Sequence, residues 1–451
     1  MAPVPASRIP LTDRESNRIR AWLQQWGPIL PLLAAEFIVW LGFGALIPVL
    51  PLYFVEQGLD LATLGLVIAA WPMARLVTEP IFGWLADRTA RVPWMVAGLL
   101  LTGLFEMLPL FLVGPIAFVV LRGAAGVAAA MYDPAARGYL TDATPPERRG
   151  EAFGLYGAAQ MGGLLIGPAI GALGAGLFGG IQFVFIFGGI ASFLSAAAVA
   201  WRVKETGSRT HPALSHDATE LPRDTPSVTE RAASDADADR MPKVDPTAPR
   251  SLLNRGLIAA LVINVGGYYA GGTYEVIWSL FLEHLGAGLD LIGFTFAMFG
   301  LPVLLLSPFA GRIVDRRGSF LFIVLGCVIP TAVGIFYTLI VDPLLAVPLI
   351  MAEATAFALL NPALYSVVAA NSPVGRSSTA QGLFGAAGTM GFIVASLVTG
   401  VLAEQEIIYP FYVFSAVMFI SLILGLLIGG RRLRYHPPAA VAAVVAPVVA
   451  R

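Results

Sequence analysis

Long apolar segments separated by short polar loops run along almost the whole chain. A helix needs about 20 apolar residues to cross the hydrocarbon core of a bilayer, and segments of that length recur from end to end. Twelve spans are predicted: 29–54, 62–85, 93–113, 115–139, 152–175, 181–201, 256–282, 290–312, 319–340, 343–369, 379–402 and 408–430. Strands of a membrane barrel would read as segments of about ten residues with alternating polarity, and the sequence has none. The pattern predicts an all-α membrane protein with twelve transmembrane helices.

The second half of the chain repeats the first at a constant offset of 228 residues. Gly83, Asp87 and Arg88 return as Gly311, Asp315 and Arg316, and further glycines and prolines keep the same offset, such as Gly65 with Gly293. One structural unit is therefore written twice, which predicts two pseudo-symmetric six-helix bundles at 29–201 and 254–430. Many transporters consist of two such halves that move about a site between them. The repeat indicates a transporter.

Polar sequence separates and flanks the two predicted bundles. Residues 202–253 are polar, mixed in charge and free of aromatic residues, so they cannot bury enough apolar surface to fold alone. We expect a flexible cytoplasmic linker there, an N-terminal tail at 1–28 and a C-terminal tail at 431–451. The first span is longer than the core of a cleavable signal peptide and is expected to stay in the mature chain.

Composition and charge distribution support this assignment and orient the chain. The protein is 57% apolar and 13% charged, whereas soluble domains are about 25% charged. Lys and Arg gather in the N-terminal tail, in the loops after the second, fourth and eighth spans, in the linker and in the C-terminal tail, while the opposite loops have none. The positive-inside rule then predicts that both termini face the cytoplasm, in a multi-pass protein of the plasma membrane, the inner membrane of a bacterial cell.

The sequence offers no recognisable catalytic machinery. It contains no histidine pair, cysteine cluster, phosphate-binding loop or Ser-His-Asp set, and its four histidines lie outside the middle of the spans. We therefore expect no enzyme activity, no metal, no cofactor and no nucleic-acid partner. The expected partners are a small-molecule substrate, protons and the lipid bilayer, and the expected state is a monomer.

Three passages go beyond a generic helical bundle. Gly42 followed by Pro48 and Pro51 predicts a kink in the first span, because proline removes a backbone donor. The sequence GWLADRTAR, with Gly83, Asp87, Arg88 and Arg91, ends the second span. The fifth span carries small residues at a four-residue spacing, which lets another helix approach closely; its glycines and proline are Gly154, Gly163, Gly167, Pro168 and Gly171. We expect the bend at Pro168 to lie where the two halves slide.

These passages resemble the signature motifs of the major facilitator superfamily over nearly the whole chain. GWLADR resembles its loop 2–3 motif, and the stretch from Asp142 to Arg148 resembles its loop 4–5 motif. Arg122, four residues before Gly126, resembles an Arg-x-x-x-Gly motif that the family links to proton coupling. The fifth-span passage is similar to one in the drug:proton antiporter branch, so the resemblance implies a twelve-helix, proton-driven exporter. Thr89-Ala90-Arg91 and Ala172 depart from the family pattern.

The loop 2–3 motif suggests a gate. Asp87 and Arg88 are either solvated loop charges or a latch that holds the cytoplasmic side shut against a helix N-terminus or an arginine. Their return as Asp315 and Arg316 favours the latch, and we expect this cytoplasmic gating set to include Gly83, Arg91, Asp142, Arg148 and Gly311.

Ionisable residues inside predicted spans are the sharpest functional signal. A charge at mid-membrane costs about 2.5–3.5 kcal/mol, so these side chains should face the interior; they are Glu36, Arg75, Glu79, Glu106, Arg122, Asp133, Glu275 and Glu353. Arg75 and Glu79 are spaced for an ion pair on one helix face. Asp133 either caps a helix kinked at Pro134 or carries protons, and Glu106 is interpreted as pointing into an outer vestibule.

Glu36 and Arg122 form the predicted coupling pair, since neither charge is repeated in the other half. The hypothesis is that Glu36 binds a proton or a cationic cargo in turn and that Arg122 sets its proton affinity. Glu275 and Glu353 add a second protonation site or bind a cationic cargo. Aromatic residues from both halves, among them Trp40 and Trp278, either line an apolar cavity together or, as is more common for any one of them, face lipid or the core.

The function predicted from these features is proton-coupled efflux of lipophilic or cationic small molecules by alternating access. Alternatives remain open: a carrier of a sugar, an organic acid or a lipid with the same fold, or a receptor that binds a ligand without transport. Few Asn and Gln residues lie in the spans, which disfavours a polar cargo. The positive-inside pattern fixes the topology and not the direction of transport.

Overall fold

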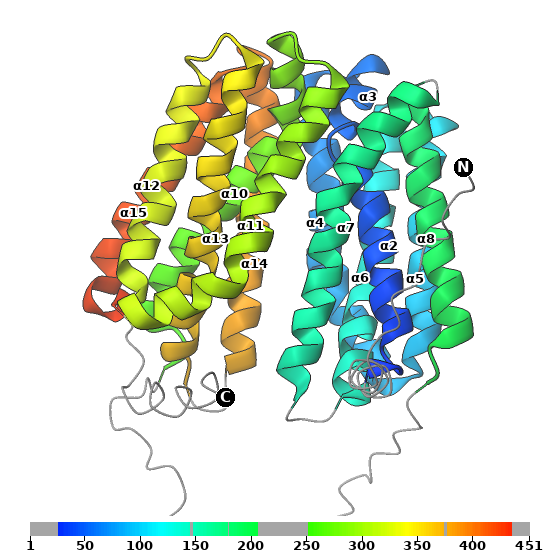
Figure 1. Ribbon diagram of the computed structural model, residues 1–451, viewed down its shortest axis with the longest axis horizontal. Helices are drawn as coiled ribbons and strands as arrows, with labels where there is room; N and C mark the ends of the chain where they lie inside the picture. The colour runs from blue at the N-terminus through cyan, green and yellow to red at the C-terminus, as the bar shows by residue number, and fades with distance from the viewer. Residues whose placement is uncertain (1–25, 145–147, 179, 206–250, 374–376, 435–451) are drawn as a thin grey trace, which may run out of the picture.

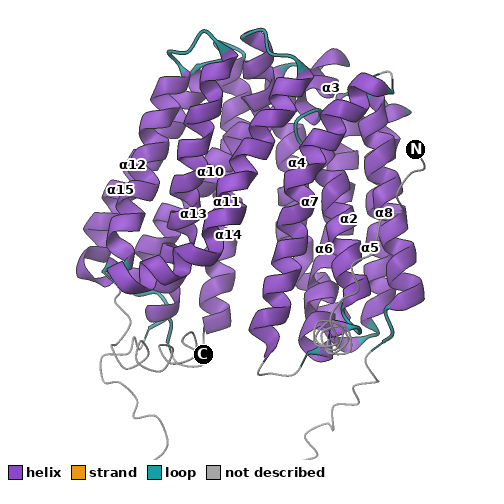
Figure 2. Cartoon of the chain, in the orientation of Figure 1, coloured by secondary structure: helices purple, strands orange, loops and turns teal. Residues whose placement is uncertain are grey.

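A computed structural model describes residues 26–144, 148–178, 180–205, 251–373 and 377–434 of the chain. The elements within these ranges are helices, without a strand (Figure 2). Eleven of the described helices are long and apolar enough to cross a membrane, and a bent pair at the start of the chain makes a twelfth span. The protein is an all-α, multi-pass membrane protein.

The first bundle is built from the helices before the linker. Its elements are α2 (Leu30–Leu46), α3 (Leu50–Glu56), α4 (Leu61–Arg88), α5 (Arg91–Met107), η1 (Leu108–Leu110), α6 (Pro115–Ala143), α7 (Arg149–Leu177) and α8 (Gln182–Arg202). The first span is broken between α2 and α3, and the chain bends there by 43°. Pro48 lies in the break and Pro51 lies in the first turn of α3, where the sequence predicts the kink.

The second bundle repeats the same order. Its elements are α10 (Arg255–His284), α11 (Leu289–Arg317), α12 (Ser319–Tyr337), η3 (Pro343–Leu345), α13 (Ala346–Ala370), α14 (Ser377–Ala403), α15 (Tyr409–Gly429) and η4 (Gly430–Leu433). The two bundles stand side by side in Figure 1. Most of the predicted linker, the N-terminal tail up to residue 25 and the C-terminal tail from residue 435 lie outside the described residues.

We name the two ends of the bundles after the charge pattern of the sequence. The inner end carries the loops at 88–91 and 317–319, and the outer end carries the loops at 57–60 and 285–288.

Loop carboxylates fix where helices begin at both ends. Asp60 accepts hydrogen bonds from the backbone N–H of Thr63 (2.7 Å) and from its hydroxyl, and Glu205 accepts from the N–H groups of Arg91 and Val92 at 2.9 and 3.0 Å. Such contacts satisfy N–H groups that a first helical turn leaves unpaired.

The glycines of the fifth span pack inside the first bundle. A methyl group added at Gly163 would lie 2.5 Å from the carbonyl oxygen of Phe37 on α2, and one at Gly167 would lie 2.6 Å from that of Leu41. Gly171 makes the next such contact along α2, whereas a methyl at Gly154 would meet nothing within 4 Å. The glycine face therefore fixes α7 against α2 within one half, and the contact that Pro168 makes with the other half lies elsewhere on α7.

The two halves meet through a pair of glycine contacts related by the 228-residue repeat. At the outer end of α4, Gly65 touches the backbone of α14 at Ser396 and Gly400. At the outer end of α11, Gly293 touches Pro168 and Ala172 of α7. Every residue of the second contact is the repeat partner of one in the first. Ala172 is thus part of the interface, and so is the backbone of Pro168.

A hydrogen bond and an apolar cluster complete the outer contact. The backbone N–H of Ala62 donates to Oε1 of Glu404, which follows α14, at 3.2 Å. Buried side chains of both halves share one cluster at this end, among them Phe54, Leu59, Trp278 and Phe281. The outer end is closed by contact between the halves.

The inner ends of the two halves lie apart. The bundles diverge from the outer end at the top of Figure 1 toward the inner end at the bottom. Methyl groups added at the repeat-related glycines Gly157 and Gly385 would meet nothing within 4 Å. Val77 on the inner half of α4 is 67% exposed. The protein is closed at its outer end and open at its inner end.

Candidate transport site

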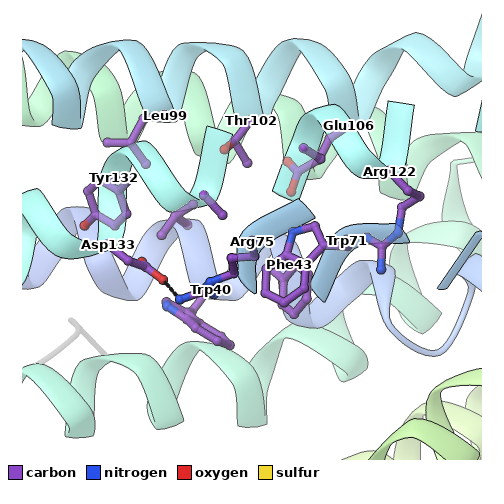
Figure 3. Close-up of a pocket in the computed structure, with 13 residues that line it drawn as sticks. Trp40, Phe43, Trp71, Arg75, Leu99, Thr102, Glu106, Arg122, Tyr132 and Asp133 are labelled. Atoms are coloured by element: carbon purple, nitrogen blue, oxygen red, sulfur yellow. Dashed lines mark hydrogen bonds and ion pairs between the residues drawn. The ribbon is translucent and has the colours of Figure 1, made fainter. Parts of the chain in front are cut away.

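A cavity of about 70 Å³ lies within the first bundle. Its walls come from α2, α4, α5 and α6 (Figure 3). The lining side chains are Val39, Trp40, Phe43, Trp71, Arg75, Leu99, Thr102, Glu106, Arg122, Ala125, Ala129, Tyr132 and Asp133. The second bundle contributes none of them, although the sequence suggested aromatic walls from both halves. Trp278 of the second bundle is buried in the core.

Aromatic rings form one wall of this cavity. The ring centroids of Trp40 and Phe43 are 5.4 Å apart in an edge-to-face arrangement, and those of Phe43 and Trp71 are 5.8 Å apart and stacked. The guanidinium of Arg75 lies 4.9 Å from the centre of the Trp71 ring. A cation over an aromatic face is attracted by the quadrupole of the ring, so this wall already holds a cation of the protein itself.

Glu36 lies fully buried directly behind the aromatic wall. Its carboxylate accepts hydrogen bonds from Nε1 of Trp40 at 2.9 Å, from the hydroxyl of Tyr132 at 2.5 Å and from Nε2 of Gln160 at 2.5 Å. None of the ion pairs between described residues involves Glu36. The carboxylate is held by neutral donors, and two of them, Trp40 and Tyr132, line the cavity.

A four-residue ion-pair network occupies the inner side of the cavity. Arg75 pairs with Glu79 at 3.2 Å, as their spacing predicts, and also with Asp133 on α6. Arg137 pairs with Glu79 at 3.6 Å and approaches Asp133 at 4.0 Å. Helix α6 continues through Pro134, so Asp133 serves as an ion-pair partner and not as a cap. Two positive and two negative side chains balance each other here.

Arg122 links the two halves of the protein. Its Nη2 lies 3.0 Å from Oε1 of Glu275 on α10. The side chains are 12% and 18% exposed, so the pair is largely shielded from water. The predicted pairing of Arg122 with Glu36 is not what the structure contains: Arg122 points across to the second bundle, and Glu36 is held by other side chains.

Two further buried carboxylates differ in where they lie. Glu353 is fully buried in the second bundle, where the hydroxyls of Tyr274 and Tyr337 donate to it at 2.7 and 3.2 Å. Glu106 lines the cavity and accepts a hydrogen bond from Ser192 at 3.1 Å. The sequence interpretation placed Glu106 in an outer vestibule, whereas its side chain lines the interior cavity.

The charged residues of loop 2–3 form an ion-pair cluster inside the first bundle. Arg91 is 6% exposed and pairs with Asp87 at 3.1 Å and with Asp142 at 3.0 Å. Arg88 lies over the ring of Trp84, 4.0 Å from its centre. Both ion pairs of Arg91 lie within the first bundle and do not join the two halves.

The remaining residues of the predicted gating set add little contact. A methyl at Gly83 would lie 3.6 Å from Pro134 of the same bundle, and Arg148 and Arg316 are exposed. The side chains at Gly311 and Asp315 lie outside the described residues.

In the first span, Gly42 packs against Gly188 and Ala191 of α8.

The fold and this interior site together define a membrane transporter built from two repeated bundles. The chain matches the profile of the Major Facilitator Superfamily over residues 32–351 and 262–449. It belongs to the Major Facilitator Superfamily, whose members are transporters and not enzymes.

Two of the similar proteins are named for drug resistance. The chain is 28% identical over 402 residues to multidrug resistance protein 2 of Bacillus subtilis (strain 168), covering 87% of this chain and 92% of that protein. It is 32% identical over 151 residues to the quinolone resistance protein NorA of Staphylococcus aureus (strain MRSA252), which covers 33% of this chain and 38% of NorA. The resemblance to multidrug efflux proteins thus extends over almost the whole length of the first of them.

Solved structures show the same fold at low sequence identity. A bacterial homologue of the human lysosomal transporter Spinster, in an inward-facing and occupied conformation, superimposes with a TM-score of 0.72. The identity is 14%, and the match covers 93% of this chain and 99% of that one. At this identity the likeness establishes the fold alone.

Proposed function

We propose that the protein exports lipophilic, cationic small molecules in exchange for protons by alternating access. The two halves contact each other at the outer end and are separate at the inner end, which is one of the two states that such a cycle needs. The multidrug efflux relatives support the cargo class and the direction. The charge pattern of the loops supports a plasma-membrane location with both termini in the cytoplasm.

Glu36 is the observation that carries this proposal. It is a buried carboxylate with neutral donors only, in contact with two side chains that line an aromatic cavity. An intramembrane carboxylate of this kind is stable when it carries a proton or faces a cation. A proton and a cationic cargo would therefore compete for one site, and competition of this kind couples the two movements.

The cavity dimensions say how the cargo would bind. Pockets for whole drug-sized ligands measure about 300–1,000 Å³, whereas this cavity measures about 70 Å³. We therefore infer that one end of the cargo enters, with a cationic or aromatic group stacking on Trp40, Phe43 or Trp71. The rest of the molecule extends toward the open inner end. Because Trp40 and Tyr132 lie between Glu36 and the cavity, the cargo reaches the carboxylate through them.

Proteoliposomes test the proposal directly. The full chain is reconstituted with a pH-sensitive dye inside, a pH gradient is imposed, and tetraphenylphosphonium is the probe cation. Substrate-evoked proton movement is expected in the unchanged protein and should be lost in Glu36→Gln. Glu56→Gln is the matched control, because Glu56 is an exposed residue at the outer end of the same span.

Two results would contradict the proposal. Full proton-driven transport by Glu36→Gln would show that Glu36 is not the coupling carboxylate. Probe movement without proton movement in the unchanged protein would indicate a uniporter with the same fold.

A further inference from the structure

Arg122 is only partly satisfied by the ion pair that joins the two halves. One of its nitrogens, Nη2, meets Glu275 at 3.0 Å, while its buried Nε has no hydrogen-bond partner among the described residues. A buried donor without an acceptor is costly, typically about 1–3 kcal/mol. The guanidinium presents several donors in a fixed fork and can serve a second carboxylate.

Glu106 is a carboxylate of the first bundle that lines the cavity together with Arg122. It comes from the neighbouring helix α5 (Figure 3). Glu106 lies in the last turn of α5, at the outer end, and its hydrogen bond comes from the neutral hydroxyl of Ser192. The Arg122–Glu275 pair is in the outer half of the span as well.

We propose that Glu106 is a positioning residue that competes with Glu275 for Arg122 and so sets whether the outer end is open or closed. When Glu106 is neutral, Arg122 pairs with Glu275, and this ion pair between the two halves holds the outer end closed. When Glu106 is charged, Arg122 finds a partner inside its own bundle, and separating the halves costs less. The inference deepens the proposed proton exchange and rests on it.

The direction of this switch agrees with export. Protons that enter from outside while the outer end is open neutralise Glu106, release Arg122 to Glu275 and favour closure. Loss of the proton to the cytoplasm returns Arg122 to Glu106 and favours outer opening with cargo bound. Each time the outer end closes and reopens, one proton therefore moves inward, and this does not depend on which cargo moves outward.

Other charged and titratable groups lie in or beside this cavity, and the test must distinguish their titration from that of Glu106. Arg122, Tyr132 and Asp133 come from α6, Arg75 comes from α4, and Glu36 with its donor Trp40 comes from α2. Helix α8 contributes the neutral Ser192, and Glu275 approaches from α10 through Arg122. Glu36 is therefore replaced by Gln in the background of the test, which removes the proton site of the proposed function.

The experiment measures the outer-closed fraction as a function of pH by spin-label distances. Labels are attached through Val113→Cys and Val341→Cys, two exposed residues in outer loops of opposite halves, with Cys327→Ala removing the native cysteine. In the Glu36→Gln background, the closed-to-open ratio is expected to rise as the pH falls, by at most about tenfold per pH unit for one proton. Glu106→Gln should remain closed at all pH values, and Glu106→Asp should keep a pH dependence with a displaced midpoint.

A double-mutant cycle tests the route through Arg122. Glu275→Gln should lower the closed fraction at every pH, and adding Glu106→Gln to it should change nothing further, because the two carboxylates act through one arginine. A pH-dependent shift of equal size with Glu106 and with Gln at this position would overturn the proposal, and so would the absence of any shift in the Glu36→Gln background. The readout needs no cargo, so failure of tetraphenylphosphonium transport leaves this test intact.

Discussion

The contact between Gly293 and α7 offers the clearest test of how the outer end closes. Replacing Gly293 with alanine would place a methyl group 2.7 Å from Cβ of Ala172 and 3.0 Å from the carbonyl oxygen of Pro168. Carbon atoms prefer a separation of about 3.5–4.0 Å, so α7 and α11 would have to part by about 1 Å. Overpacking of this kind costs about 1–3 kcal/mol, and it acts on the outer-closed state, in which these helices touch.

The closed-to-open ratio is therefore expected to fall by about 5-fold to 150-fold. The spin-label pair at positions 113 and 341 measures this ratio in Gly293→Ala. Gly176→Ala is the matched control on α7, because a methyl group there would meet nothing within 4 Å. Adding Ala172→Gly to Gly293→Ala removes the shortest contact and should restore part of the closed state.

Equal distance distributions for Gly293→Ala, Gly176→Ala and the unchanged protein would refute this reasoning. The glycine contact would then be a consequence of closure by other interactions and would contribute little to its free energy. A change in Gly293→Ala that Ala172→Gly does not reverse would point to the Pro168 carbonyl as the controlling contact.

Three further predictions follow from other parts of the structure. Gly157→Leu adds bulk at an inner end that is open here, so inner closure should fail; transport in proteoliposomes is expected to be lost while the closed outer fraction rises. Arg91→Ala breaks the buried ion pair with Asp142, at a cost of about 3–5 kcal/mol, and should lower the thermal unfolding temperature in detergent. Arg88→Ala loses an exposed cation–π contact worth about 0.5–1 kcal/mol and should change this temperature little. Equal shifts for the two variants would count against the burial argument. Glu404→Ala removes a hydrogen bond between the halves and should lower the closed-to-open ratio about twofold to tenfold, with Glu406→Ala in the same loop as the unaffected control.

Much of this protein follows from its sequence because its determinants are local or periodic. Hydropathy sets the spans, since a bilayer of fixed thickness requires segments of a given length. The observed helices agree with the predicted spans to within about three residues at most ends, whereas the C-terminal ends of α5, α6 and α11 differ by more. The Arg75–Glu79 pair was predictable because one turn of helix places these residues together, and proline chemistry predicted the break in the first span.

Only the tertiary structure decided which residues face each other across different helices. Spacing shows that Gly163, Gly167 and Gly171 share a face of one helix, but not that α2 of the same bundle covers that face. It shows that Arg122 must find a partner, but not that the partner is Glu275, 153 positions further along the chain. The physical reason is that the rotation of each helix about its axis is set by packing against all its neighbours at once. For the same reason, only the structure shows that Glu106 lines the cavity. It also shows that the two halves contact each other through repeat-related glycines, which no local pattern identifies as partners.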